Sequence, residues 1–180
     1  MKMLNSLIPW STKSSNLLKV LLFVIVAVSF SACGDDSDNN FFFDAEAQKQ
    51  IDEKVIRQYF RNNNVDTTAV ERTSSGLYYL EIAPGTGAAI ETGDLVEVMY
   101  IGKLTNGFKF DSSYDRGNAF TFTVGAQQVI KGWDEGLPLM KVGEEARLFI
   151  PSHLGYGYRG SGSIPPNSVL IFDIKVNRKK

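Results

Sequence analysis

The chain has 180 residues, which is enough for one ordinary domain with extensions. Its formal net charge is −1, and removing the three lysines before Cys33 leaves 19 − 3 = 16 basic residues against 20 acidic ones. This mildly acidic body argues against nucleic acid as a partner, because phosphate binding needs a basic face. Cys33 and His153 are the single cysteine and histidine, so the sequence excludes an internal disulfide and disfavours a zinc site or a catalytic triad.

Residues 1–32 have the pattern of a secretory signal. Lys13 and Lys19 flank the start of an apolar run at residues 17–30, whose uninterrupted part, residues 20–28, is shorter than the roughly 20 residues of a membrane-spanning helix. Small residues then precede Cys33, which resembles the lipobox of bacterial lipoproteins. The resemblance implies that Cys33 becomes the lipidated first residue of the mature protein and anchors it to a membrane of the cell envelope. An ordinary signal, or an uncleaved anchor with a chance cysteine, is the alternative.

Residues 33–43 are predicted to form an acidic, flexible tether. Residues 34–40 are polar and include no core residue, which favours a solvated spacer. Acidic stretches after a lipidated cysteine also resemble surface-export signals of some Gram-negative lipoproteins. Two locations therefore stay open, the outer membrane facing the periplasm and the cell surface. Three phenylalanines at residues 41–43 could dock on the domain or touch the membrane surface.

A helix is expected from about residue 45 to residue 61, within a segment of helix and linker at residues 44–75. Asp44 can cap its first turn, and three asparagines at residues 62–64 end it. Its apolar residues form one stripe, namely Ile51, Val55, Ile56, Tyr59 and Phe60. Packing of the stripe on the following domain is favoured over self-association, because a helix this short makes a marginal dimer arm.

Residues 76–180 have the pattern of one α+β domain. Apolar alternation predicts strands at residues 77–82, 95–104, 108–110, 120–124, 147–150 and 169–176, with Asn106-Gly107 as a hairpin turn. The only helical pattern is at residues 127–139, where two glycines and a proline require support from tertiary packing. One short helix among five or six antiparallel strands predicts a sheet wrapped around that helix. A loop rich in glycine, serine and proline covers residues 155–166.

Aromatic residues gather on inward strand positions, on the predicted helix and in the long loop. In a domain this small, one helix cannot cover so many rings without leaving a concave face. Plain core packing is nevertheless favoured for any single ring. The residues are Tyr100, Phe110, Phe120, Phe122, Trp133, Tyr156 and Phe172.

Five motifs follow one another along this domain. They are YxGxLxxGxxFDSS at residues 100–113, VIxGWxxGL at 129–137, YG at 156–157, IPP at 164–166 and FD at 172–173. Their order and spacing resemble the FKBP family of prolyl isomerases, the macrolide-binding immunophilins, over about residues 76–176. The resemblance implies an FKBP-type peptidyl-prolyl cis-trans isomerase that needs no nucleophile, metal or cofactor.

The resemblance also implies a proline pocket, carried over position by position. Catalytic roles would fall to Tyr100, Phe110, Asp111, Tyr156 and Phe172. Substrate binding would fall to Phe120, Val129, Ile130, Trp133 and Ile164. Trp133 would form the floor, while the Tyr156 hydroxyl and the Ile130 backbone would hydrogen-bond the peptide. Arg116 would pair with Asp111 and hold it in place, and a purely structural role for Asp111 is the alternative.

Four positions depart from the commonest family pattern. Gln128 stands where many members have Glu, Leu154 replaces a frequent Tyr, and the loop with Ser161 and Ser163 is one residue shorter. These departures concern substrate preference and macrolide affinity, and they leave the implied pocket residues in place.

The implied reaction is rotation about X-Pro bonds in unfolded or folding envelope proteins. A rotating peptide bond faces a barrier of about 18–20 kcal/mol from amide resonance, and the twisted amide is less polar than the planar one. A dry, ring-lined pocket should therefore favour the twisted form, with about 1.36 kcal/mol of selective binding for each tenfold acceleration. A non-catalytic proline-peptide binding module or chaperone is the main alternative, and a structural envelope lipoprotein ranks last.

Overall fold

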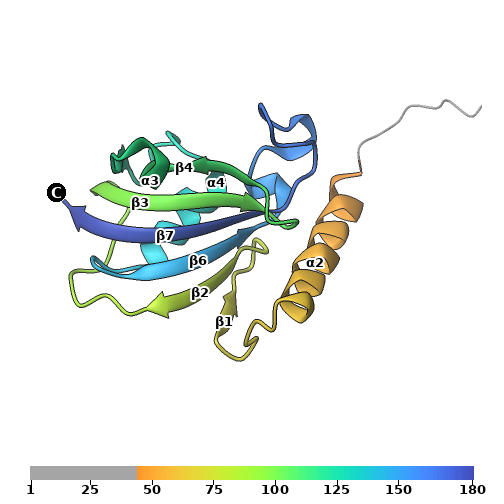
Figure 1. The fold of residues 1–180 in the computed structure, drawn as a ribbon, viewed down its shortest axis with the longest axis horizontal. Helices are drawn as coiled ribbons and strands as arrows, with labels where there is room; N and C mark the ends of the chain where they lie inside the picture. Colours follow the sequence, from red (N-terminus) through yellow and green to blue (C-terminus); the bar gives the residue numbers. More distant parts are fainter. Residues whose placement is uncertain (1–43) are drawn as a thin grey trace, which may run out of the picture. The chain divides into compact units, whose positions relative to one another are not determined.

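A seven-stranded antiparallel sheet forms the body of the protein (Figure 1). The computed structural model describes residues 44–180, so the predicted signal, the tether and Cys33 lie outside the described residues. The strands run in the order β1-β2-β6-β7-β3-β4, and β5 pairs with β3. Their bounds are β1 Val70–Arg72, β2 Tyr78–Ala83, β3 Leu95–Leu104, β4 Lys109–Ser112, β5 Phe120–Thr123, β6 Glu145–Ile150 and β7 Leu170–Lys179.

Strands β3 and β7 form the centre of the sheet. They pair from Val96↔Lys179 to Leu104↔Leu170, and β4 and β5 pair with successive parts of the other edge of β3. The helix α4 (Lys131–Gly136), extended by the 3-10 turn η1 (Leu137–Leu139), lies behind the sheet in Figure 1. This arrangement confirms the predicted α+β class, an antiparallel sheet wrapped around one short helix.

Alternation along β3 explains which side of the sheet forms the main core. Val96, Val98 and Tyr100 are buried together with Trp133 and Leu137 of the helical segment. Each large apolar side chain that leaves water in this way stabilises the fold by roughly 1.5–3 kcal/mol. Because one short helix fills the inside of the sheet, the core and any cavity on that side share residues.

Two elements differ from the sequence-based expectation. The sheet has seven strands rather than five or six, because β1 is short, mostly exposed and without apolar alternation, yet pairs with β2. The helix predicted at 127–139 begins only at Lys131. Gln127 has a positive φ of 57°, and the Asp134 carboxylate accepts hydrogen bonds from the backbone N–H groups of Gly125 and Gln127. These contacts fix residues 125–128 as a turn.

The sequence-based expectation also missed a helix, α3 (Ser113–Arg116), directly after β4. The Ser112 side chain caps its start by accepting a hydrogen bond from Asp115 N, and Gly117 ends it in the left-handed conformation. The predicted hairpin before β4 is confirmed. Leu104 N–H donates to the Phe108 carbonyl at 2.9 Å, across a turn in which Gly107 has a φ of 86°.

The N-terminal helix α2 (Ala45–Asn62) packs on the opposite face of the sheet from α4. Asp44 caps it, as predicted, by accepting hydrogen bonds from Glu46 N and Ala47 N. Ile56 and Phe60 are buried in a second apolar cluster, with Tyr78, Phe149, Val169 and Ile171. The strand residues of this cluster alternate with those of the main core, so the helix covers the outer face. Packing of α2 on the domain is therefore confirmed.

The stripe predicted for α2 needs one correction. Ile51 is 50% exposed, whereas Asp52 is 1% exposed. The buried line runs through Asp52, Ile56 and Phe60, because a helix with 3.6 residues per turn returns to the same face after three or four residues. None of the helices within residues 44–180 combines the length and the hydropathy of a membrane-spanning segment.

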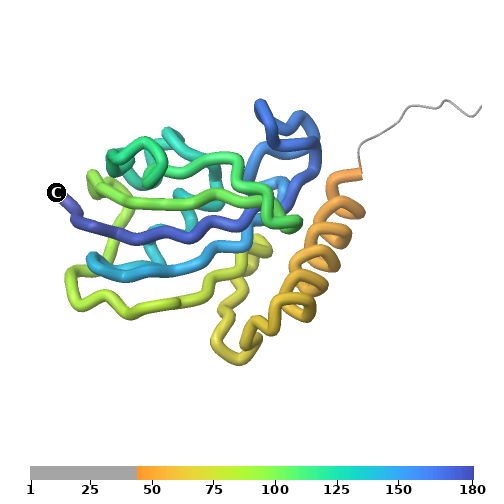
Figure 2. Tube along the Cα trace, in the orientation of Figure 1, coloured from red at the N-terminus to blue at the C-terminus, as the bar shows by residue number. Residues whose placement is uncertain are grey.

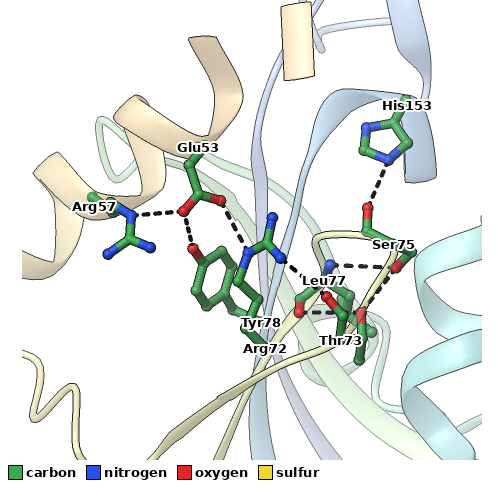
Figure 3. A network of polar contacts seen from close by, with 8 residues as sticks. All are labelled: Glu53, Arg57, Arg72, Thr73, Ser75, Leu77, Tyr78 and His153. Carbon is green, nitrogen blue, oxygen red and sulfur yellow. Dashed lines mark hydrogen bonds and ion pairs between the residues drawn. The ribbon is translucent and has the colours of Figure 1, made fainter. Parts of the chain in front are cut away.

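A polar network also attaches α2 to the sheet (Figure 3). The Glu53 carboxylate accepts hydrogen bonds from the Tyr78 hydroxyl at 2.5 Å, from Arg57 Nε at 2.6 Å and from Arg72 Nε at 3.2 Å. Burial raises the pKa of Glu53, but these three donors outweigh it and the net pKa is lowered. The carboxylate is thus held in its charged form between the helix and the edge strands.

The first half of α2, the β3–β4 turn and the chain after residue 155 lie at the same end of the molecule (Figure 2). Ile51 and Val55 of α2 line one groove with Leu104 of β3, with Pro165 of the long loop and with Val169 just before β7. The loop that was predicted at residues 155–166 therefore has α2 as a neighbour.

Candidate active site

A cavity of about 390 Å³ lies between α4, the strands β3, β4 and β5, and the long loop. Every residue that the motifs assigned to the pocket lines this cavity, namely Tyr100, Phe110, Asp111, Phe120, Val129, Ile130, Trp133, Tyr156, Ile164 and Phe172. Four residues without a predicted role line it too: Gln128, Ser161, Gly162 and Ser163. Segments as distant in sequence as residues 100 and 172 are thus brought into one concave site.

Trp133 is at the centre of the ring cluster. Its ring meets Tyr100 edge to face with 4.9 Å between centroids, and meets Phe172 edge to face with 5.2 Å. These three residues are 3%, 7% and 4% exposed, so they form a buried floor. Phe110 stands against Phe172 at 5.5 Å and is only partly buried, as expected of a wall.

Phe122 is the one ring of the aromatic pattern that does not line the cavity. It is 2% exposed and contacts Trp133 from behind, with 5.6 Å between centroids. For Phe122 the alternative of plain core packing is therefore confirmed. Its neighbour Phe120 stacks on it at 5.4 Å and reaches the cavity.

Gly102 allows the two wall rings to lie directly against β3. A Cβ atom at this position would be 2.6 Å from the ring of Phe110 and 2.8 Å from the ring of Phe172. Real Cβ contacts are not that short, so any side chain here would displace one ring or the other. The glycine of the first motif is thus explained by the close approach of Phe110 and Phe172 to the backbone.

Asp111 is the centre of the polar side of the site. The Tyr100 hydroxyl donates to Asp111 Oδ2 at 2.5 Å, and the Ser112 N–H donates to Oδ1 at 2.8 Å. Arg116 forms the predicted ion pair with Asp111 through Nη1 and donates to the Tyr100 hydroxyl through Nη2 at 2.8 Å. Burial raises the pKa of Asp111, but the hydrogen bonds from Tyr100, Arg116 and Ser112 outweigh it. The net pKa is lowered, so the carboxylate is charged at neutral pH.

The Tyr156 hydroxyl and the Ile130 N–H are among the cavity donors that have no hydrogen-bond partner within the described part of the chain. Tyr156 is 39% exposed, and no acceptor for its hydroxyl lies among residues 44–180. Burial and then the negative charge of Asp111 raise the pKa of Tyr156, which keeps its proton in place. The Ile130 N–H, just before α4, likewise has no acceptor among the described residues. Both groups are free to donate to a bound peptide.

The loop residues that prediction missed are held by a tight turn. Ser161 N–H donates to the Ile164 carbonyl at 2.9 Å, and Ile164 N–H donates to the Ser161 carbonyl at 2.8 Å. Gly160 allows this turn, since it has a φ of 64° and a Cβ there would be 2.3 Å from the Ile164 carbonyl oxygen. The sequence signal was the glycine-rich stretch before IPP, which indicated a turn without indicating that it closes over the cavity.

Gln128 lines the cavity, whereas His153 lies outside it. Gln128 Oε1 accepts a hydrogen bond from Thr123 N–H at 2.9 Å, which ties the 125–128 turn to β5 beside the cavity. His153 does not line the cavity. It lines a separate groove between α2 and the turn at residues 73–77, where its Nε2 lies 3.0 Å from the Ser75 carbonyl oxygen.

A family model described as FKBP-type peptidyl-prolyl cis-trans isomerase matches residues 87–177, about half of the chain. The chain belongs to the FKBP family. This membership confirms the enzyme class that the motifs predicted, a peptidyl-prolyl cis-trans isomerase. Among residues 44–180 no group of three or more His, Cys, Asp or Glu side chains is placed to hold a metal ion.

Two relatives of this FKBP chain differ in length. It is 57% identical over 97 residues to FK506-binding protein 1 of Saccharomyces cerevisiae, covering 53% of this chain and 85% of that one. It is 43% identical over 142 residues to the FKBP-type isomerase FkpA of Aeromonas hydrophila, covering 78% of this chain and 52% of that one. The chain thus spans about half the length of this bacterial relative.

A solved structure supports the same fold. The crystal structure of FkpA from Escherichia coli has a TM-score of 0.63 and 32% sequence identity, covering 94% of this chain and 75% of that one. The similarity covers more of the chain than the FKBP family model alone, which matches residues 87–177.

Proposed function

We propose that this FKBP domain accelerates rotation of X-Pro bonds by non-covalent stabilisation of the twisted amide in the ring-lined cavity. The proposal rests on one observation, that a single cavity combines a buried floor of rings, which includes Trp133 and Phe172, with a polar side that Asp111 holds in place. A proline ring packs on Trp133 and Phe172, while the peptide backbone reaches the free donors of Tyr156 and Ile130.

The physical basis is the difference in polarity between the two amide forms. The planar amide is stabilised by resonance, and it loses that conjugation as the bond turns. The twisted form is therefore less polar, so its transfer from water into an apolar pocket costs less free energy. Only this differential binding accelerates rotation, because binding both forms equally leaves the barrier unchanged.

In this proposal the polar residues act as fixed dipoles. The Asp111–Arg116 pair is held by four hydrogen bonds that also involve Tyr100 and Ser112, so it needs no reorganisation when the bond turns. The Tyr156 hydroxyl donates to the rotating peptide. Phe110 and Phe120 close the apolar walls, with Val129 and Ile164 beside them.

The test is a protease-coupled assay of a proline tetrapeptide on the full-length chain. The wild-type chain is expected to accelerate the slow phase, and Asp111→Leu and Phe110→Tyr to lower kcat/KM by about tenfold or more. A chain that leaves the slow phase unchanged would be a holdase or a binding module, which contradicts the proposal. Full activity in Asp111→Leu would refute the assigned site. A macrolide such as FK506 is expected to compete, in line with the name of the yeast relative.

We further propose that the protein is a lipoprotein of the cell envelope that acts on unfolded or folding envelope proteins. The support is the pattern of residues 1–33, with an apolar run, small residues and the single Cys33. The acidic stretch after Cys33 fits either a spacer at the periplasmic face of the outer membrane or a surface-export signal. Incorporation of a labelled fatty acid in a bacterial host, lost in Cys33→Ser, is the expected result. Equal labelling of Cys33→Ser would refute the anchor.

A further inference from the structure

Asp52 and Ser152 are joined by two hydrogen bonds although they lie 100 residues apart. Asp52 Oδ2 accepts from the Ser152 backbone N–H at 2.8 Å and from the Ser152 hydroxyl at 2.7 Å. The other carboxylate oxygen accepts from Gln48 Nε2 at 2.8 Å. Asp52 and Ser152 are each 1% exposed. A side chain of α2 thus holds a backbone amide of the FKBP domain inside the protein.

Ser152 stands where the chain leaves the sheet for the pocket loop. It begins the 3-10 turn η2 (Ser152–Leu154), which follows β6 after Pro151 alone. Tyr156 comes two residues after this turn, and the loop continues to the tight turn at residues 161–164. The chain then returns to the sheet at β7. The position of Ser152 therefore sets the origin of the segment that forms one wall of the cavity.

The same turn is also connected to the pocket floor. His153 Nε2 lies 3.0 Å from the Ser75 carbonyl oxygen, and Figure 3 draws this contact as a dashed line. The Ser75 hydroxyl donates to Glu135 Oε1 at 2.7 Å, and Glu135 lies on α4 two positions after Trp133. The turn that Asp52 holds is thus linked through Ser75 to the helix that carries the floor ring.

An acid is a costly residue for the buried face of α2. Its neighbours on that face, Ile56 and Phe60, contribute apolar burial, and an apolar side chain could cover the same place. Burying a carboxylate costs several kcal/mol unless hydrogen bonds replace those to water. The carboxylate instead makes a directional contact, because its hydrogen bonds fix the position of the Ser152 donor atoms. An apolar contact at the same place would let the two segments shift relative to each other.

We propose that Asp52 is a positioning residue of the isomerase. Its carboxylate holds the Ser152 amide and thereby sets the place of Tyr156 and Ile164 in the pocket. This inference rests on the proposed function of that pocket. Helix α2 is then a working part of the catalytic unit and not only a spacer before the domain.

The experiment compares kcat and KM of full-length variants in the proline-peptide assay, at a temperature where each retains the wild-type circular dichroism. Asp52→Ala is expected to lower kcat/KM about tenfold, most of it through KM, because the pocket loop shifts relative to the rings. Asp52→Asn is expected to recover most of the loss. Its amide oxygen can accept the Ser152 bonds, and Gln48 can turn its own oxygen toward the new amide.

Glu53→Ala is the matched control. It removes the ties of α2 to Tyr78 and Arg72 one residue away, without touching Ser152. Its kcat/KM is expected to stay within about twofold of wild type. An equal loss in Glu53→Ala would overturn the inference, since general loosening of α2 would then suffice. Wild-type kinetics in Asp52→Ala would overturn it as well.

Ser152→Ala and Asp111→Leu separate failure of the positioning inference from failure of the proposed function. If Asp52→Ala does not fold, Ser152→Ala removes only the hydroxyl bond and is expected to raise KM about two- to threefold. An unchanged KM there would refute the inference. Asp111→Leu serves as the reference for the pocket itself. If Asp111→Leu is impaired while the Asp52 and Ser152 variants are not, the positioning inference fails and the proposed function stands. Full activity in Asp111→Leu makes both fail.

Discussion

Trp133 and Phe172 meet edge to face, with 5.2 Å between ring centroids and 84° between ring planes. They come from α4 and β7, so this corner of the pocket exists only when the helix is packed inside the sheet. Edge-to-face pairs of this kind contribute about 0.5–1.5 kcal/mol beyond their area burial. The floor of the proposed active site is therefore also a part of the folded core.

Trp133→Phe should impair activity more than stability. The smaller ring leaves the floor incomplete, so kcat/KM is expected to fall about three- to tenfold through weaker proline packing. Phe122→Leu is the control, because Phe122 contacts Trp133 without lining the cavity. It should cost about 1–2 kcal/mol in urea unfolding and change kcat/KM by less than about twofold. An equal loss of activity in both variants would contradict the assignment of Trp133 as the floor.

Gly102→Ala should open the pocket walls. The added methyl group would overlap the rings of Phe110 and Phe172, so both must move. We expect kcat/KM to fall about tenfold or more, with a cost of about 1–3 kcal/mol in the free energy of unfolding. Lys103→Ala is the control, since Lys103 pairs with Asp173 at 3.2 Å and does not line the cavity. Undiminished activity in Gly102→Ala would show that the walls are not needed.

The pH dependence of the reaction should reflect the lowered pKa of Asp111. A carboxylate whose folded pKa lies below its ordinary value of 3.8 is favoured in its charged form. The stability that its contacts provide is complete above the ordinary pKa and is lost as the pH falls through the folded pKa. The wild-type rate should therefore be flat from about pH 5 to about pH 9.

Below about pH 4 the wild-type rate is expected to fall because Asp111 becomes protonated. The Asp111→Asn variant, which has no carboxylate at this position, should not show this fall. Protease-free NMR exchange spectroscopy of an X-Pro peptide measures both chains across this range. A wild-type rate that falls between about pH 7 and pH 5 would contradict a charge held by Tyr100 and Arg116, since the pKa of Asp111 would then be raised.

Docking of α2 should contribute to the stability of the domain. Phe60 is 5% exposed and meets Phe149 edge to face at 4.7 Å, so Phe60→Ala is expected to cost about 3 kcal/mol in urea unfolding. Ile51→Ala should cost less than about 0.5 kcal/mol, because that side chain is 50% exposed. Equal costs would mean that the helix packs through the stripe expected from its four-residue spacing.

Several features could be predicted because their causes are local in the chain. Asp44 precedes a helix and accepts its first free N–H groups, and Asn106-Gly107 forms the turn of a hairpin. The alternation of Val96, Val98 and Tyr100 marks the buried side of β3. The resemblance of the motifs to the FKBP family then implied the pocket residues, since in one family the same positions of the fold carry the same residues.

Other features depend on segments that meet only in the folded protein. The helix pattern at 127–139 was too long, because Asp134 binds back to Gly125 and Gln127 and forms a turn there. Ile51 was expected to be buried, and Asp52 is buried in its place because Ser152 supplies donors from 100 residues away. The apolar periodicity of α2 contains no information about a hydrogen-bond partner that lies so far away in the sequence.

The sequence by itself determined the family, the sheet with its enclosed helix and the set of rings and polar residues that make a proline site. Local alternation and turn residues indicate the sheet, and the family and the site residues follow from the resemblance of the motifs to the FKBP family. Only the tertiary structure decided that Phe122 stays behind the floor, that Ser161 to Ser163 close the cavity and that α2 reaches Ser152. Each of these depends on contacts between distant segments, whose geometry is fixed when helix and loop pack against the twisted sheet.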